Sequence, residues 1–210
     1  MEKTHWRKVC EVAQRAHTEA DAIQFWGTSY TDDSGATRPI FNYRFEHTLA
    51  TVKIARWLSI MTGADLEIVE CAAWLHDCRK FLSSPQSSDT HAQEASAAIE
   101  YILEISDFPK TKIPAVRHAI ENHVGFELIS KLEPLETACL WDADKLSKIG
   151  AAGLAHYISI AGILEKSMDT TKLLLHGEQW LQRAQIITKS MNTDAAKQEA
   201  IHRLSFVTNY

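Results

Sequence analysis

Asp142 occupies a position where a charged side chain is unexpected. On a helix, its neighbours at helical spacing include Leu135, Cys139, Leu146 and Ile149, so the carboxylate lies in the middle of an apolar face. Burying a carboxylate is costly unless a cation or strong hydrogen-bond donors compensate for the lost water. Two explanations therefore stay open: Asp142 binds a metal ion, or it accepts hydrogen bonds from a buried arginine, histidine or backbone amide.

Several histidines interrupt apolar segments in a similar way. His76 and Asp77 are adjacent and follow an apolar run, and together they offer a neutral nitrogen and an anionic oxygen to a borderline divalent metal. His47, His91 and His123 also lie on the apolar faces of expected helices. Ordinary core histidines explain one or two such cases, but not all of them. Inward histidines and carboxylates are a recognised way to build a metal site in a helical bundle.

The rest of the chain indicates the helices that must position these residues. Only 8 glycines and 5 prolines occur among 210 residues, which favours helices because both residues are costly in helix interiors. Apolar spacing and capping residues predict helices over 2–26, 44–61, 65–79, 91–105, 114–124 and 134–148. Two or three more are expected between 151 and 206, with a break at 168–170. No convincing strand pattern is present, so the sequence predicts an all-α fold.

Turn-forming residues mark the breaks between these helices. Gly63 is expected to end one helix and Asp65 to cap the next. The stretches 27–43 and 82–89 are rich in turn formers and are predicted to be loops. Both loops adjoin helices that carry the histidines, so they are expected to rim any pocket beside them.

Composition limits the function classes. The formal net charge of −5 argues against a general binder of polymeric nucleic acid, which needs a cationic surface. The four cysteines form no CxxC pair, so a zinc knuckle is not expected, and the apolar stretches around Cys71 and Cys139 suit a reducing compartment. The amino-terminal residues lack the apolar core of a secretory signal, and no run approaches the roughly 20 apolar residues of a membrane span. A cytoplasmic protein without a membrane partner is expected.

The order of these residues resembles the H…HD…D signature of the HD-domain phosphohydrolase superfamily. The matching stretches are Arg44-Phe45-Glu46-His47, Ala72-Ala73-Trp74-Leu75-His76-Asp77, and Trp141-Asp142-Ala143-Asp144-Lys145-Leu146. The resemblance covers about residues 44–157. It implies a single HD-type domain over 1–210, with its core at 44–157 and with the helices at 2–26 and 170–206 as extensions.

The resemblance also implies a set of metal ligands. One divalent ion would be bound by His47, His76, Asp77 and Asp142. A second ion, bridged by Asp77, would be held by His91 and His123, although these two histidines could instead contact phosphate or support the first ligands. Histidine and aspartate ligands accept Mn, Mg, Fe, Co and Ni, so the sequence does not select the metal.

The chemistry is expected to come from that metal. The sequence contains no GxSxG elbow and no GxxxxGK[ST] phosphate loop. A bound divalent ion can lower the pKa of its water to about 7 and can polarise a phosphoryl oxygen.

Cationic side chains near the expected ligands are candidates for binding phosphate. Lys80 matches the lysine of the HDxxK pattern, and Arg44 is the second candidate. For Arg79, a solvated surface charge explains the residue as well as phosphate binding does. For Lys145, the surface charge is the better explanation. Glu46 and Asp144 flank expected ligands, where they could orient them or act on protons. Tyr30, Phe41 and Tyr43 could stack on a base or simply pack.

These features predict a metal-dependent phosphohydrolase that acts on a small phosphorylated metabolite, with a nucleotide as the favoured substrate and Asp77, Lys80 and Arg44 as catalytic residues. Two other classes stay open: a di-iron oxygenase of the HD type, and a non-catalytic nucleotide-binding or regulatory module. The apolar residues of the carboxy-terminal helices also leave a homodimer open.

Overall fold

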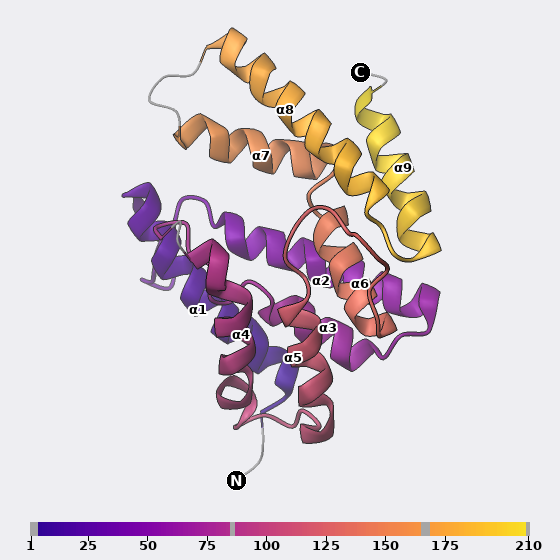
Figure 1. The fold of residues 1–210 in the computed structure, drawn as a ribbon. Coiled ribbons are helices and arrows are strands. Elements are labelled where there is room, and N and C mark those ends of the chain that lie inside the picture. Colours follow the sequence, from indigo (N-terminus) through magenta and orange to yellow (C-terminus); the bar gives the residue numbers. More distant parts are fainter. Residues whose placement is uncertain (1–3, 85–86, 165–168, 209–210) are drawn as a thin grey trace.

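The computed structural model describes residues 4–84, 87–164 and 169–208, and most of them are helical (Figure 1). The helices are α1 (Trp6–Trp26), α2 (Tyr43–Thr62), α3 (Leu66–Leu75), α4 (Ser87–Leu103), α5 (Ile113–Glu121), α6 (Leu135–Leu146), α7 (Gly150–Leu164), α8 (Thr170–Lys189) and α9 (Asp194–Thr208), with a 3-10 turn, η1, at Lys110–Lys112. The all-α prediction is confirmed.

The helices divide into a lower group and a smaller upper group. In the lower group, α2 packs on α3 and α6, α3 also contacts α5 and α6, and α4 lies against α5. Helix α1 covers α2, α3 and α4 on the outside. The upper group is formed by α7, α8 and α9, which pack on one another at one end of the molecule (Figure 1). Helix α9 also contacts α2 and α6 and so joins the two groups.

The core is apolar and contiguous. Leu58, Leu75, Ile99, Ile120 and Leu140 come from five different helices, and all are fully buried. Removing these side chains from water is the main force that holds the helices together. The polar cluster described below lies among these same helices.

Capping residues fix the ends of the helix pair α2 and α3. The side chain of Asn42 accepts a hydrogen bond from the amide of Phe45 at the start of α2. Gly63 ends α2 with a positive φ of 77°, a conformation that glycine adopts without steric cost. Asp65 then caps α3 by accepting from the amides of Glu67 and Ile68. The predictions for Gly63 and Asp65 are confirmed.

Helices α3 and α5 end at least three residues earlier than the sequence pattern predicts, and both ends are followed by polar residues of interest. Helix α3 ends at Leu75 rather than at 79, because the following residues form tight turns. The backbone amide of Cys78 donates a hydrogen bond to the carbonyl of Leu75, and that of Lys80 donates to the carbonyl of Asp77. Helix α5 ends at Glu121 rather than at 124. His76, Asp77 and His123 therefore lie in turns and not on helical stripes.

The stretch 27–43, predicted to be a loop without strands, contains a short hairpin. Strand β1 (Ser29–Thr31) pairs antiparallel with β2 (Thr37–Pro39). Asp32 holds the connecting turn by accepting hydrogen bonds from the amides of Ser34 and Ala36. Strands of three residues are too short to show an alternating pattern, which is why the sequence did not indicate them.

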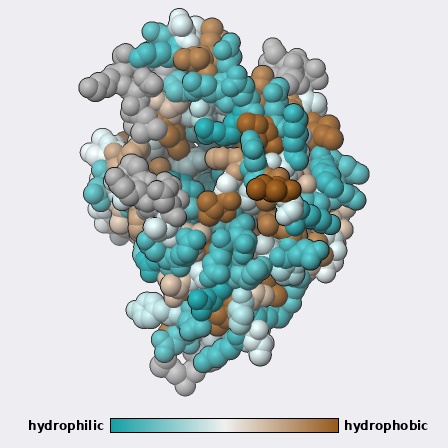
Figure 2. Space-filling view, viewed as in Figure 1, coloured by the Kyte–Doolittle hydropathy of each residue, from teal (hydrophilic) through white to brown (hydrophobic). Residues whose placement is uncertain are grey.

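Part of the apolar surface of the carboxy-terminal helices is exposed. Trp180 and Ile187 are buried inside the upper group, whereas Leu174 and Leu175 are 66% and 52% exposed. On the face shown in Figure 2, apolar residues alternate with hydrophilic ones. Within the described residues, no helix combines the length and the apolar character needed to cross a membrane.

All four cysteines, Cys10, Cys71, Cys78 and Cys139, are buried free thiols. Burial raises the pKa of the Cys78 thiol to about 12 and that of Cys139 to about 11, and it also raises the pKa of Cys71. Because the thiolate is the reactive form, we expect Ellman's reagent to react slowly with the native chain even at pH 9, and with four thiols after denaturation. A rapid native reaction of one or more thiols would contradict this expectation.

Candidate metal centre

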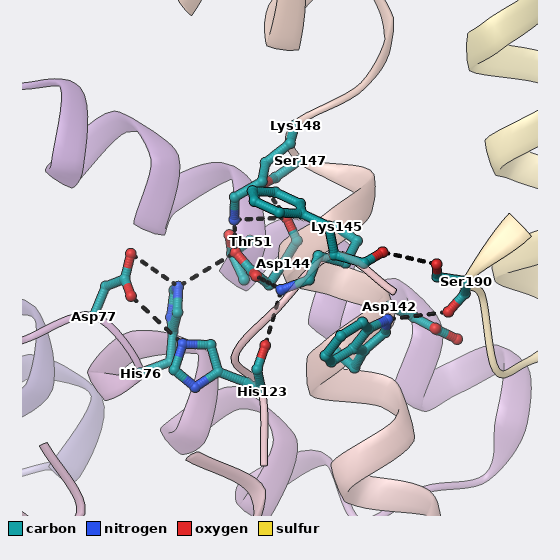
Figure 3. A network of polar contacts seen from close by, with 12 residues as sticks. Thr51, His76, Asp77, His123, Asp142, Asp144, Lys145, Ser147, Lys148 and Ser190 are labelled. Atoms are coloured by element: carbon teal, nitrogen blue, oxygen red, sulfur yellow. Dashed lines mark hydrogen bonds and ion pairs between the residues drawn. The ribbon is translucent and has the colours of Figure 1, made fainter. Parts of the chain in front are cut away.

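Histidines and aspartates from five helical segments meet in the core between α2, α3, α4, α5 and α6. His47 is on α2, His91 on α4 and Asp144 on α6, while His76 and Asp77 follow α3. His123 follows α5. All six side chains are at most 3% exposed. Figure 3 shows how several of them face one another. We call these six residues the His–Asp cluster.

The imidazole Nε2 atoms converge at the centre of the cluster. Nε2 of His76 lies 3.4 Å from Nε2 of His47, and Nε2 of His91 lies 3.3 Å from Nε2 of His123. Such short distances between ring nitrogens are unfavourable when both atoms carry lone pairs, unless a cation lies between or beside them.

Hydrogen bonds to the opposite nitrogens show that lone pairs do face the centre. Nδ1 of His76 lies 2.8 Å from the carbonyl of Ala73, and Nδ1 of His123 lies 2.6 Å from that of Ile120. A carbonyl only accepts, so both Nδ1 atoms donate. Neutral imidazole carries one proton, which leaves Nε2 of each ring as an acceptor. A backbone contact that fixes the tautomer in this way is typical of metal-binding histidines.

His47 is also protonated on Nδ1, in this case through a contact with the hydroxyl of Ser147. The hydroxyl of Ser147 donates to the carbonyl of Asp144 at 2.7 Å and lies 3.0 Å from Nδ1 of His47. Since the single hydroxyl proton is already used, the hydroxyl oxygen accepts from Nδ1. The Nε2 lone pair of His47 therefore also points into the cluster.

The two carboxylates divide the cluster into two overlapping groups that could each hold a metal ion. Oδ1 of Asp144 lies 3.0 Å from Nε2 of His47 and 3.6 Å from Nε2 of His76. The second group consists of His76, Asp77 and His123, with Asp77 Oδ1 3.5 Å from Nε2 of His123. His91 adjoins this group, with Nε2 3.3 Å from the same oxygen. The buried Oδ1 of Asp77 accepts no hydrogen bond from the described residues.

The assignment of Asp142 as a metal ligand is wrong. Its Oδ1 accepts from the backbone amide and the side-chain amide of Asn192, at 2.8 and 3.1 Å. Its Oδ2 accepts from the amide and hydroxyl of Thr193, both at 2.8 Å. Asp142 thus anchors the chain at the start of α9, and Figure 3 shows it on the side of α6 away from His76. Asp144 takes the place in the cluster that the sequence analysis gave to Asp142.

The error came from the burial pattern of α6. Every residue from Thr137 to Leu146 is buried, so this helix has no solvent face and an apolar stripe does not single out one inward direction. The alternative explanation for Asp142, a buried carboxylate bonded to backbone amides, is the one the structure supports. A better signal for Asp144 was the pair of lysines at 145 and 148, which provide cations next to its carboxylate.

Burial and neighbouring charges together set the protonation states of the cluster. Burial, reinforced by Lys148, lowers the pKa of His47 to about 3, and burial lowers that of His123 to about 4. Burial opposes ionisation of Asp77, but Lys80 and the surrounding imidazoles outweigh it and hold the pKa of this carboxyl well below its usual range. Lys145 and Lys148 do the same for Asp144. Neutral histidines and ionised carboxylates are the forms that bind metals.

Lys145 and Lys148 place positive charge next to the carboxylate of Asp144. Lys145 contacts Oδ2 and also donates to the carbonyl of His123 at 2.9 Å, while Lys148 contacts Oδ1. The Lys148 ammonium also lies 3.3 Å from Nε2 of His47. It therefore contacts two atoms, this Nε2 and Oδ1 of Asp144, that could instead bind a metal ion. Neutral nitrogens, ionised oxygens and a bound ammonium show that the cluster fits a cation.

A pocket of about 510 Å³ opens beside His47, between α2, the segment after α3, α7 and α8. The hollow between the upper and lower helix groups is also visible on the face shown in Figure 2. Its cationic lining residues are Arg44, Lys80, Lys148 and Arg183, and none of the described residues that line it is acidic. We call it the cationic pocket. Its lining favours an anionic ligand that reaches the cluster.

The two residues predicted to bind phosphate both lie at the junction of cluster and pocket. Nη1 of Arg44 is 3.5 Å from Oδ2 of Asp77, and Nζ of Lys80 is 3.6 Å from Oδ1. The buried Nε of Arg44 makes no hydrogen bond with the described residues. Of the cations predicted with less support, Arg79 turns to His17 on α1, and Lys145 is buried against Asp144.

The aromatic lining of the cationic pocket was only partly expected. Tyr43 lines it, whereas Phe41 and Tyr30 line a neighbouring cavity near the hairpin. Phe126, Tyr157 and Trp180 line the cationic pocket as well, and the sequence analysis missed them. They come from three separate segments, so no local motif could have grouped them. Leu82 also lines the pocket; residues 85 and 86 of that predicted loop lie outside the described residues.

Comparison with known families supports the sequence resemblance. A model of the HD domain family matches residues 44–149, which is half of the chain and includes all six residues of the His–Asp cluster. The chain belongs to the HD domain family. Helices α1, α7, α8 and α9 lie outside the matched region of this HD domain protein.

Similar proteins extend beyond the matched region. Bacillus subtilis YpgQ is 28% identical over 198 residues, which are 91% of this chain and 90% of YpgQ. The crystal structure of YpgQ in complex with ADP superposes with a TM-score of 0.58 at 22% identity, covering 96% of this chain and 93% of that one. A predicted HD superfamily hydrolase from an uncultured Thermotogales bacterium gives 0.59 at 21% identity, covering 97% and 87%. These structures share the fold along nearly the whole chain.

Proposed function

We propose that this HD domain protein is a metal-dependent phosphohydrolase that acts on a nucleotide. The observation that carries the proposal is the position of the cationic pocket: it is lined by His47 of the His–Asp cluster and by Lys148, which contacts Asp144 of the same cluster. Membership in a family with hydrolase relatives supports the hydrolytic class. The nucleotide is supported by the ADP complex of YpgQ and by the aromatic lining of the pocket.

His47, His76, Asp77 and Asp144 would hold one divalent ion. His91 and His123 would complete a second site with Asp77, whose Oδ1 lies within 3.5 Å of both of these histidines. When bound, a divalent ion supplies Lewis acidity for the transfer of a phosphoryl group to water. The pKa shifts hold both carboxylates ionised and keep His47 and His123 neutral, so no proton has to leave these ligand atoms before the ion binds.

Arg44, Lys80 and Lys148 would bind the phosphates. Arg44 is suited to this role because its guanidinium is pre-oriented by Asp77 and its buried Nε is unused by the described residues. Guanidinium groups recognise phosphate through two parallel hydrogen bonds, whereas the ammonium groups of Lys80 and Lys148 act as compact charges. With a divalent ion offsetting the two carboxylates, these three cations give the junction a net positive charge that favours a phosphate anion.

The aromatic wall would bind the base. Tyr43, Phe126, Tyr157 and Trp180 all line the cationic pocket. Arg183 lies over the rings of Phe126 and Tyr157, at 5.2 and 5.6 Å from their centroids, and this contact holds the wall in place. A ligand with an aromatic base and charged phosphates matches the two chemistries of this pocket.

The decisive experiment measures the release of phosphate and pyrophosphate from a panel of ribonucleotides and deoxyribonucleotides. The chain is first stripped of metal, and Mn, Mg, Co, Ni or Fe is then added in turn. We expect release from at least one nucleotide that requires added metal, and the product identifies the bond that is cleaved. Metal that binds without any release across the panel would contradict the proposed function, and oxygen uptake with iron would then indicate an oxygenase.

A further inference from the structure

Helix α1 makes polar contacts with the segment that carries Lys80, although α1 lies outside the region matched by the HD domain model. This segment, residues 76–84, has no regular secondary structure that could fix it. Asp77 and Lys80 are therefore held by turns, and the position of Lys80 depends on what the neighbouring residues contact.

Asp21 on α1 binds the chain just after Lys80. Its Oδ2 accepts from the amide of Leu82 at 2.6 Å, and its Oδ1 accepts from the amide and the hydroxyl of Ser83 at 3.0 and 2.5 Å. Asp21 is only 5% exposed, so its carboxylate has little access to water and depends on these donors. A buried carboxylate that accepts three hydrogen bonds is a strong and specific anchor, because leaving its donors unpaired is costly.

His17, one helical turn earlier on α1, binds the residue just before Lys80. Its Nε2 lies 3.0 Å from Nη1 of Arg79, and its ring also packs near Phe81. Because a guanidinium can only donate, the imidazole nitrogen accepts, so His17 is neutral in this contact. Helix α1 thus holds the segment on both sides of Lys80.

We infer that Asp21 and His17 form a clamp that positions Lys80 for binding the phosphate of the substrate. This inference rests on the proposed function for the role of Lys80, but the clamp itself rests on the contacts above. Neither residue lines the cationic pocket, so both are positioning residues. The attachment of α1 does not depend on them, because Trp6, Val9 and Cys10 bury the same helix in the core, and Arg7 bonds to Glu70.

Amide exchange tests the clamp without reference to any activity. In the Asp21→Asn variant, the single carbonyl oxygen cannot replace two carboxylate oxygens, so at least one of the amides of Leu82 and Ser83 loses its acceptor. We expect exchange of these amides, followed by NMR, to accelerate by at least about tenfold, with α2 and α6 unchanged. Asp33→Asn, at an exposed residue of the hairpin turn, is the matched control. Unchanged exchange at Leu82 and Ser83 would overturn the clamp.

Binding of ADP tests whether the clamp acts through Lys80. Isothermal titration calorimetry is carried out in EDTA, so that turnover does not interfere, on the wild type, Asp21→Asn, Lys80→Ala and the double variant. We expect each single variant to weaken ADP binding by about tenfold and the double variant to bind no more weakly than Lys80→Ala, because the clamp has nothing left to position. Ser83→Ala, which removes only one of the three bonds, should have a smaller effect than Asp21→Asn.

The outcomes separate the clamp from the proposed function. Additive losses in the double variant would overturn the inference, since Asp21 would then act on stability and not through Lys80. A wild-type chain that does not bind ADP, together with a silent nucleotide panel, would contradict the proposed function and the phosphate role of Lys80. Amide exchange would still decide in that case whether Asp21 holds the segment.

Discussion

The Asp77→Ala variant is expected to lose metal-dependent phosphohydrolase activity by at least about a thousandfold, since even the outer partners of metal ligands cost about 10–100-fold. Asp77 lies within 3.9 Å of four imidazole Nε2 atoms, those of His47, His76, His91 and His123. It also contacts Arg44 and Lys80. Its removal therefore takes a ligand from both proposed metal sites and releases Arg44 and Lys80, two of the cations proposed to bind phosphate.

The measurement for Asp77→Ala combines turnover with bound-metal content and circular dichroism. We expect the helical content to stay nearly unchanged, because Asp77 lies in a turn and makes no backbone hydrogen bond through its side chain among those described. Asp33→Asn again serves as the control and should retain full activity. Activity within tenfold of the wild type in Asp77→Ala would rule out the proposed mechanism.

Asp142 and Asp144 lie two residues apart on α6, and their variants are expected to differ: one should lose stability and the other bound metal. Asp144→Asn is expected to lose bound metal and activity, because it removes the anionic oxygen that lies 3.0 Å from Nε2 of His47. Asp142→Asn is expected to retain the metal but to unfold more easily. Its Nδ2 group would face a donor from Thr193 or Asn192, which leaves at least one buried hydrogen bond unmade.

We expect Asp142→Asn to lower the free energy of unfolding by about 2–3 kcal/mol, the cost of leaving a buried partner of a charged group unsatisfied. For a chain of this length, each kcal/mol lowers the melting temperature by about 2–4 °C. Thermal unfolding, metal content and turnover at low temperature would be measured on both variants. Loss of metal in Asp142→Asn with retention in Asp144→Asn would contradict the placement of Asp144 in the metal site.

The fold and five of the six cluster residues could be predicted from the sequence because their signals are local. A low content of glycine and proline and the apolar spacing at 3.6 residues indicate helices, and capping residues such as Gly63 and Asp65 mark their ends. His76 and Asp77 carry the strongest motif, and its spacing relative to His47 resembles the family signature. The amino-acid order alone thus placed a polar cluster in an apolar helical core.

The tertiary structure decided what each buried acid contacts. Asp142 and Asp144 are both buried, and the sequence around them does not say that α9 begins beside one and that His47 lies beside the other. Similarly, no pattern in α1 predicts that Asp21 binds Leu82, which lies 61 residues further along the chain. Burial and helical spacing can be read from the chain, because they follow from local sequence. The partner that compensates a buried charge comes from a distant segment, and only packing brings the two together.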